Sequence, residues 1–243
     1  YHLIVLAPAS VQEAVDLTAL AFDLAEKYRM VACLLMDGYL GQMMEPVELP
    51  EFVPIRTEAP NWAVGAEHPD GERSVLTSIN ISAPVQEIFN VKMMSRWQEI
   101  ERDEVRYKGY HLDDAEYVVV GYGTAGRIAL TSVRAAREKG VKVGLLRPIT
   151  VSPFPFKELD ELVPGKKGIL VVEMNNGQML DDVAAVVAKR VPLHFYGRMG
   201  GMVPYPDEID TAIEEMVHGE HDVNRDARGT WLAKMRELVG TGA

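Results

Sequence analysis

The residues whose spacing points most directly to chemistry are three glycines, Gly121, Gly123 and Gly126. They follow an apolar run at 117–120 and precede a helical stretch at 127–139, the order that opens a doubly wound, dinucleotide-binding α/β domain. Glycines in such a turn let backbone N–H groups at the helix start approach a phosphate closely. The turn therefore holds a dinucleotide, holds another ligand, or only packs the helix on the strand.

The strand that follows, at 141–146, bears on the choice of dinucleotide. An NAD site places an acidic residue at the end of this strand to hold the ribose hydroxyls, whereas Arg147 stands here. An arginine can meet a 2′-phosphate, as in NADP sites, or any other phosphate or carboxylate. One hypothesis is therefore a free-standing NADP-dependent oxidoreductase that uses Gly121, Gly123, Gly126 and Arg147.

Other side chains with catalytic potential are dispersed. Asp37 and Glu45 have the chemistry of an acid/base pair, but their positions are typical of turn and surface carboxylates. Cys33 lies in an apolar run and is expected in the core. His218 and His221 resemble a metal pair, yet the intervening glycine favours a solvated helix end. We predict no metal site and no catalytic residue; the remaining histidines support no triad: His2, His68, His111 and His194.

Two strand–helix–strand units must position these residues. In the first, a strand at 3–6 leads to a helix capped by Ser10 and Glu13, then to an apolar run at 30–36 typical of a strand buried on both faces. The second unit begins at Asp114. Its predicted strands are 117–120, 141–146, 168–172 and 192–196, and its predicted helices are 127–139, 157–162, 181–189, 206–217 and 226–239.

Ligands bind beyond the carboxyl ends of strands in open parallel sheets. The loops at those ends are rich in glycine and polar residues, as expected for a binding edge, for a subunit interface or for ordinary α/β loops. These loops are 37–42, 121–126, 147–150, 173–178 and 197–201.

A connector and a long helix separate the two units. The connector is rich in prolines between Pro46 and Pro84 and contains a turn at 68–71. These features predict an irregular loop that runs over the protein surface. The helix is capped by Ser82, has a solvated, charged end at 99–106 and stops at Gly109. Its predicted buried stripe is Val85, Ile88, Phe89, Met93, Trp97 and Ile100.

Composition excludes several functions. The net charge of −11 disfavours nucleic acid and anionic membrane surfaces as partners, and no apolar run approaches the ~20 residues needed to cross a membrane. One cysteine in 243 residues cannot hold an iron–sulfur cluster, and it favours a reducing, cytoplasmic setting. A start inside a strand, without Met, suggests a piece of a longer protein.

Several separate motifs are similar to the alpha subunit of 2-oxoacid:ferredoxin oxidoreductases, and most of all to its branched-chain, 2-oxoisovalerate (3-methyl-2-oxobutanoate) type. They are YHLIVLAPASVQEA at 1–14, DGYLGQMMEP at 37–46, VVGYGTAGR at 119–127, LRPIT at 146–150 with PFP at 153–155, and VEMNNGQM at 172–179. The run at 30–37 departs from the family's usual Pro-Val at the start of this strand.

The resemblance implies an α/β fold in which the last part of a thiamine-type pyrimidine-binding domain precedes a transketolase C-terminal-like, Rossmann-like domain with a parallel sheet. The domains would be 1–50 (pyrimidine-binding part), 51–114 (linker and long helix) and 115–243 (transketolase C-terminal-like). The family's catalytic glutamate belongs to the part of the pyrimidine domain that is missing here. No residue of this chain is therefore assigned its role.

The resemblance also implies an activity and its cofactors. A 2-oxoacid would be oxidatively decarboxylated and joined to coenzyme A, with the electrons passed to ferredoxin. Thiamine diphosphate and magnesium would be shared with a beta subunit, and iron–sulfur clusters would lie on partner subunits, including the beta and delta chains of a complex that also has gamma chains. The chain would be inactive alone. Candidate polar contacts at the shared edge are Arg147, Asn175, Asn176 and Gln178.

On that comparison the glycine turn serves mainly to pack a helix on a strand. Two alternatives remain: the NADP-dependent oxidoreductase above, and a non-catalytic module that only holds partner subunits together.

Overall fold

The computed structural model describes residues 2–51, 60, 62–63, 77, 79–187, 189–219, 221–238 and 240. Most of the predicted connector, including the turn at 68–71, lies outside these residues. The chain forms two units, one made of Tyr1–Glu48 with Ile100–Ala243 and the other of Leu49–Glu99. No helix in the described ranges combines the length and the apolar character of a membrane span.

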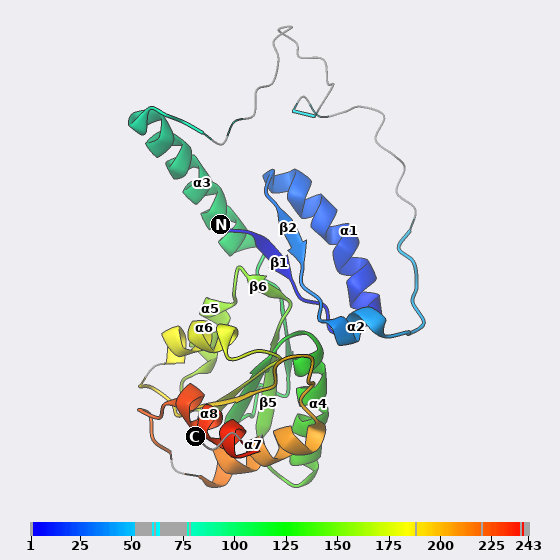
Figure 1. Cartoon of the computed structure of the whole chain (residues 1–243), viewed down its shortest axis with the longest axis vertical. Helices are drawn as coiled ribbons and strands as arrows, with labels where there is room; N and C mark the ends of the chain where they lie inside the picture. The colour runs from blue at the N-terminus through cyan, green and yellow to red at the C-terminus, as the bar shows by residue number, and fades with distance from the viewer. Residues whose placement is uncertain are drawn as a thin grey trace, which may run out of the picture. The chain divides into compact units, whose positions relative to one another are not determined.

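The first unit contains a small sheet whose strands come from distant parts of the chain (Figure 1). Strands β1 (Ile4–Leu6) and β2 (Ala32–Leu34) are parallel and are connected by helix α1 (Val11–Tyr28), which confirms the first predicted strand–helix–strand unit. The third strand, β6 (Thr150–Ser152), comes from the second half of the chain and pairs antiparallel with β1. The strand order is β2-β1-β6, and the sequence analysis did not predict β6.

Helix α1 begins at the predicted cap. The Ser10 side chain accepts a hydrogen bond from the Glu13 backbone N–H at 3.1 Å. The Glu13 carboxylate accepts one from the backbone N–H of Ala9 at 3.0 Å, one residue before the position that a capping box uses. Both side chains therefore satisfy N–H groups at the helix start.

The prediction that 30–36 forms a strand buried on both faces was wrong. Strand β2 has only three residues, all half-buried, and Leu35 and Met36 beyond it are 42% and 44% exposed. The reason is position: β2 lies at the end of the strand order, so within the described residues only β1 pairs with it. Cys33, expected in the core, is half-buried for the same reason.

A five-stranded sheet forms the core of the first unit, in the order β3-β5-β4-β7-β8. Four strands are parallel, and their near-continuous apolar runs are buried because helices cover both faces. The parallel strands are β4 (Tyr117–Gly121), β5 (Val143–Pro148), β7 (Gly168–Glu173) and β8 (Leu193–Gly197).

Alternate residues of these strands point into two separate apolar clusters, so the sheet is doubly wound as predicted. Val119, Leu145 and Leu170 pack against helices α4 (Gly123–Glu138) and α7 (Pro206–His218). Val120 and Val171 face the other cluster. That cluster is covered by helices α5 (Phe156–Leu162), α6 (Gln178–Val187) and α8 (Ala227–Leu238).

The fifth strand replaces the predicted end of the long helix. Helix α3 (Ala83–Asp103) ends before Arg106, and β3 (Tyr107–Tyr110) follows it, antiparallel to β5. Gly109, predicted to stop the helix, therefore lies inside a strand. Gly109 pairs with Leu146 of β5. This long-range pairing, which no local sequence pattern indicates, fixes an extended conformation at 107–110.

Most of helix α3 belongs to the second unit. The predicted buried stripe is only partly correct: Trp97 is buried, as is Ile100 at the helix end in the first unit, but Val85, Ile88 and Phe89 are 51%, 56% and 40% exposed. The sequence pattern predicted the helix correctly, but it did not indicate which of its turns are covered.

Candidate functional site

The carboxyl ends of β2, β4 and β7 meet at one edge of the first unit. They surround a cavity of about 120 Å³. Three of the five loops named at strand ends, at 37–42, 121–126 and 173–178, contribute to its wall, whereas those at 147–150 and 197–201 do not. The cavity is lined by Leu35, Met36, Asp37, Tyr122, Gly123, Ala125 and Met174.

The glycine turn at this edge is closely packed. A Cβ added at Gly126 would lie 2.4 Å from the carbonyl oxygen of Gly121, closer than any side chain can approach. Gly126 also faces the side chain of Arg147, whose Cγ would lie 3.1 Å from such a Cβ. The first turn of α4 thus lies directly on the end of β4, which supports packing as the role of Gly121 and Gly126.

The start of α4 already has protein oxygens beside it. Gly123 has a φ of +55°, a conformation that favours glycine, and a Cβ there would lie 3.7 Å from both Asp37 Oδ2 and the Pro8 carbonyl oxygen. In a dinucleotide site this position belongs to the pyrophosphate. A carboxylate and a carbonyl oxygen would repel that group, so the geometry disfavours a dinucleotide in this turn.

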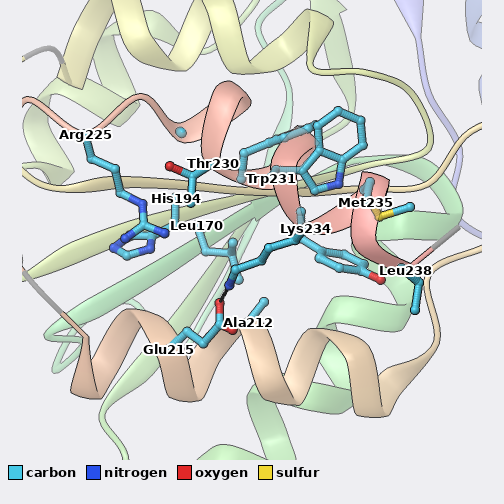
Figure 2. Close-up of a pocket in the computed structure, with 13 residues that line it drawn as sticks. Leu170, His194, Ala212, Glu215, Arg225, Thr230, Trp231, Lys234, Met235 and Leu238 are labelled. Carbon is cyan, nitrogen blue, oxygen red and sulfur yellow. Dashed lines mark hydrogen bonds and ion pairs between the residues drawn. The ribbon is translucent and has the colours of Figure 1, made fainter. Parts of the chain in front are cut away.

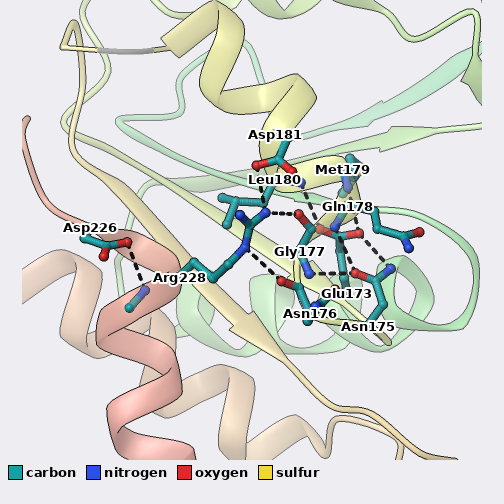
Figure 3. A network of polar contacts seen from close by, with 11 residues as sticks. Glu173, Asn175, Asn176, Gly177, Gln178, Met179, Leu180, Asp181, Asp226 and Arg228 are labelled. Carbon is teal, nitrogen blue, oxygen red and sulfur yellow. Dashed lines mark hydrogen bonds and ion pairs between the residues drawn. The ribbon is translucent and has the colours of Figure 1, made fainter.

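A buried carboxylate organises the neighbouring loop (Figure 3). Glu173, at the end of β7, is fully buried and accepts hydrogen bonds from the backbone N–H groups of Met179 and Leu180, at 3.0 and 2.9 Å. These N–H groups belong to the first turn of α6, where helical N–H groups lack partners. The carboxylate also accepts from Asn175 Nδ2 at 2.9 Å. Glu173 therefore caps α6 from inside the fold.

Asn175 extends this network to the cavity. Its Oδ1 accepts from the N–H groups of Gly177 and Gln178, and its Nδ2 also donates to the Tyr122 hydroxyl oxygen at 3.2 Å. Both functional ends of the Asn175 amide are thus used within the protein. Among the described residues the Tyr122 hydroxyl accepts from Asn175, and the Tyr122 side chain lines the cavity.

Burial raises the pKa of both acids in this network. Loss of solvent raises the pKa of Glu173, although the hydrogen bonds from Met179, Asn175 and Leu180 act in the opposite direction. Burial, together with the negative charge of Glu173, raises the pKa of Tyr122 to about 12. Tyr122 is therefore a neutral hydrogen-bond donor at physiological pH.

Arg147 has a partner that the sequence analysis did not assign. It is 3% exposed, and its guanidinium donates two hydrogen bonds to the Glu13 carboxylate, at 2.6 and 3.0 Å. Lys108 donates to the same carboxylate at 2.7 Å. Burial alone would raise the pKa of Glu13, but the hydrogen bonds from Lys108, Ala9 and Arg147 and the charge of Arg147 outweigh it and lower the pKa.

Asp37 and Glu45 do not form an acid/base pair. Asp37 accepts from the backbone N–H of Leu40 at 2.9 Å and so caps the short helix α2 (Gly38–Gln42). Glu45 accepts from Arg127 at 2.6 Å and from the Val11 N–H at 3.0 Å. Their interpretation as turn and surface carboxylates is confirmed.

The four predicted contact residues fall into two classes. Arg147 and Asn175 are bound to other protein groups, whereas the side chains of Asn176 and Gln178 are exposed. Arg228 of α8 supports their loop, because it donates to the backbone carbonyls of Asn176 and Gly177.

Sequence reasoning did not identify two residues of this edge, Tyr122 and Glu173. Both stand in runs that were singled out, and a lone acidic residue at the end of a buried strand was an available signal. In the part of the chain that the structure describes, no three His, Cys, Asp or Glu side chains gather as metal ligands. The cavity offers a phenol and one carboxylate, and its lining contains no cationic side chain.

Two family models match the chain. The thiamine-diphosphate-binding domain of pyruvate flavodoxin/ferredoxin oxidoreductase matches residues 1–111, and core domain II of pyruvate:ferredoxin oxidoreductase matches residues 115–209. The two matches meet between β3 and β4, so the first model includes one strand of the five-stranded sheet.

Curated relatives agree with these models. The ketoisovalerate oxidoreductase subunit VorB of Methanothermobacter thermautotrophicus is 42% identical over 91% of this chain and 62% of its own length. The 2-oxoglutarate synthase subunit KorA of Methanothermobacter marburgensis is 33% identical over 89% of this chain and 64% of its own length. The chain thus spans slightly under two thirds of these relatives.

The fold is also that of a solved relative. A 2-oxoglutarate:ferredoxin oxidoreductase from Magnetococcus marinus, with 2-oxoglutarate, coenzyme A and succinyl-CoA bound, superposes with a TM-score of 0.71 at 18% identity, over 89% of this chain and 42% of that one. Together, the two domain matches, the sequence relatives and the shared α/β fold show that the chain belongs to the family of alpha-type subunits of 2-oxoacid:ferredoxin oxidoreductases.

Proposed function

We propose that the chain is part of a thiamine diphosphate-dependent enzyme that oxidatively decarboxylates a branched-chain 2-oxoacid to its acyl-CoA and reduces ferredoxin. The observation that carries this proposal is a difference in identity. Two ketoisovalerate oxidoreductase subunits are 42% and 40% identical to the chain, whereas 2-oxoglutarate synthase subunits reach 33%. The single cysteine supports a reducing, cytoplasmic setting with iron–sulfur clusters on partner subunits.

The division of the cofactor between subunits follows from the charges at the carboxyl edge. A diphosphate with magnesium needs cationic side chains or helix N–H groups, and carboxylates for the metal. Here Asp37 and the Pro8 carbonyl lie beside the start of α4, and Arg147 is paired with Glu13. The described residues do not fit the diphosphate end of the cofactor, which we assign with its magnesium to a beta subunit.

The polar contacts of this edge are then divided between two roles. The exposed side chains of Asn176 and Gln178 reach coenzyme A or the beta subunit, while Arg147 and Asn175 hold the shape of the edge. Residues 1–50 act as part of the pyrimidine-binding domain, 51–114 as linker and long helix, and 115–243 as the transketolase C-terminal-like domain. Gamma and delta subunits and ferredoxin complete the assembly.

The substrate is tested with the complete enzyme. The full-length subunit is co-expressed with its proposed partner subunits, and reduction of ferredoxin is followed with coenzyme A and one of three acids. We expect kcat/KM to be at least tenfold higher for 3-methyl-2-oxobutanoate than for 2-oxoglutarate or pyruvate. A preference for either of the other acids would overturn the branched-chain assignment and leave the reaction class standing.

The same co-expressed enzyme tests whether the exposed side chains of this edge take part in catalysis or only hold partner subunits together. The double variant Asn176→Ala/Gln178→Ala is compared with Asn224→Ala, which removes an exposed amide elsewhere. If the edge contacts coenzyme A, its KM rises in the double variant and is unchanged in the control. Normal turnover with full assembly in both would favour the non-catalytic assembly module.

The NADP-dependent alternative has its own test. The oxygens beside Gly123 and the pairing of Arg147 with Glu13 disfavour NADP. Titration of the chain with NADPH, followed by nucleotide fluorescence, should show no saturable binding. Saturable binding that is lost in Arg147→Met would reinstate this alternative.

A further inference from the structure

A second cavity lies among β8, α7 and α8, away from the loops of the carboxyl edge described above (Figure 2). Its volume is about 180 Å³. An apolar protein cavity of roughly 150 Å³ accommodates benzene, so this one has room for a ligand of about six to eight heavy atoms. Most of the wall is apolar and includes Leu170, Phe195, Trp231 and Met235.

One polar side chain in the wall lacks a partner. His194 of β8 is 4% exposed, and its Nε2 has no hydrogen-bond partner among the described residues. Burial, and the positive charge of Arg225 next, lower the pKa of this imidazole to about 4, so the ring is neutral at physiological pH. A buried polar atom without a partner is rare in native proteins, which points to an occupant that hydrogen-bonds to it.

Arg225, beside His194, forms no ion pair with any of the residues that the structure describes. Arg225, which lies before α8, extends toward the His194 ring, and its Nε is a second buried atom without a partner in the described part of the chain (Figure 2). Of the other charged groups around the ring, Glu215 of α7 is paired with Lys234 of α8, and His221 adds no negative charge. An anionic group would neutralise Arg225 and accept from both nitrogens.

We propose that this cavity binds a short aliphatic monocarboxylate. The carboxylate accepts hydrogen bonds from Arg225 Nε and His194 Nε2, and the apolar body lies against Leu170, Phe195 and Trp231. One charge and an apolar space of this size select against both diphosphate-sized anions and long acyl chains. The donor on His194 requires the tautomer with its proton on Nε2.

The fluorescence of Trp231 can report whether the cavity is occupied. It lines the cavity, and its indole Nε1 donates to the Gly197 carbonyl at 3.0 Å, so its emission should respond to an occupant. The full chain is titrated with 3-methylbutanoate and with 3-methyl-2-oxobutanoate, and calorimetry confirms the stoichiometry. Saturable one-to-one binding of either acid supports the site, and the tighter acid identifies its source as a saturated acid or a 2-oxoacid.

Three comparisons decide the recognition chemistry. Arg225→Gln should raise Kd at least tenfold, while Arg190→Gln, which removes an arginine paired with Asp160 on α5, should leave it unchanged. The neutral amide of 3-methylbutanoate should bind at least tenfold more weakly than the acid. Histidine NMR should show the His194 ring shifting on ligand addition in the wild type and in Arg190→Gln.

Three results would overturn the proposed binding site. Equal affinity for acid and amide, or an unchanged Kd in a folded Arg225→Gln, would overturn the proposal in favour of a merely apolar cavity. Absence of saturable binding, with the His194 resonances unmoved, would mean that ordered water satisfies Nε2, and would overturn it as well.

Discussion

The guanidinium of Arg147 and the carboxylate of Glu13 form a two-hydrogen-bond ion pair, at 2.6 and 3.0 Å, between the end of β5 and the start of α1. Arg147 occupies the position where a dinucleotide site holds ribose. Its partner is instead the residue that helps to cap α1. The pair thus connects β5 of the five-stranded sheet, where Arg147 faces the glycine turn, to the first helix of the chain.

Glu13→Gln should lower the free energy of unfolding by about 3 kcal/mol, because it leaves Arg147 buried without its counter-charge. The measurement is urea unfolding at pH 7. The matched control is Glu214→Gln, which breaks an ion pair with Lys139 whose partners are both 62% exposed, and should change stability by less than about 0.5 kcal/mol. Equal effects in the two variants would contradict a special role for the buried pair.

The same pair makes stability depend on pH. Because the pKa of Glu13 is net lowered in the fold, its contribution is present above the ordinary pKa of 4.5 and is lost as pH falls through the lowered value. Unfolding measured from pH 6 down to pH 3 should show this loss in the wild type and a shallower slope in Glu13→Gln. Parallel slopes would assign the acid sensitivity to other carboxylates.

Glu173→Ala should destabilise the protein by about 3 kcal/mol, because two N–H groups of α6 and the Asn175 amide lose a buried acceptor. Thermal unfolding gives the change, and Glu161→Ala, at a side chain that is 67% exposed, is the control. Since burial raises the pKa of Glu173, its ionisation weakens the fold as pH rises from 4.5 through the raised value. That component should disappear in the variant.

Gly126→Ala should be among the most damaging substitutions in the chain, at about 3 kcal/mol or more, because its Cβ would meet the Gly121 backbone. Gly38→Ala has open space around the added Cβ and should be neutral or slightly stabilising. Circular dichroism melts of both variants test the packing role of the turn. A well-tolerated Gly126→Ala would require a looser contact between α4 and β4.

His194 should remain neutral to about pH 4, against an ordinary value of 6.5. The unfolded chain takes up this proton first as pH falls, so stability is lost between those values, by roughly 3 kcal/mol in total. Histidine NMR gives the titration, and unfolding at pH 7.5 and 4.5 gives the stability. His194→Leu should remove this part of the pH dependence, whereas exposed His218→Gln should not.

Much of the fold was predictable because its signals are local. The buried strands β4, β5 and β7 are nearly continuous apolar runs, and Ser10 is a typical capping residue at the start of α1. Strands β3 and β6 were not predictable, because they exist only through pairing with distant strands. The half-buried state of β2 was missed because an apolar run does not say how many neighbours a strand has.

The sequence indicated where a candidate site would lie, but it did not indicate the contacts among its side chains. The rule that ligands bind at the carboxyl ends of strands located the edge, and Arg147 and Glu13 were each singled out. Their pairing was not found, because the sequence carries no sign of which distant side chain reaches which. The same limit hid the link from Glu173 through Asn175 to Tyr122.

Strand β6 has a consequence for the order in which the molecule is made. During synthesis β1 and β2 are made long before Thr150–Ser152. The small sheet can therefore gain its third strand only after β3, β4 and β5 of the larger sheet have been made. Such long-range pairing is slow and forms late. A cut between the two regions that separate family models recognise would part β1 from β6 and β3 from β5, so each piece would lack a strand that its sheet contains.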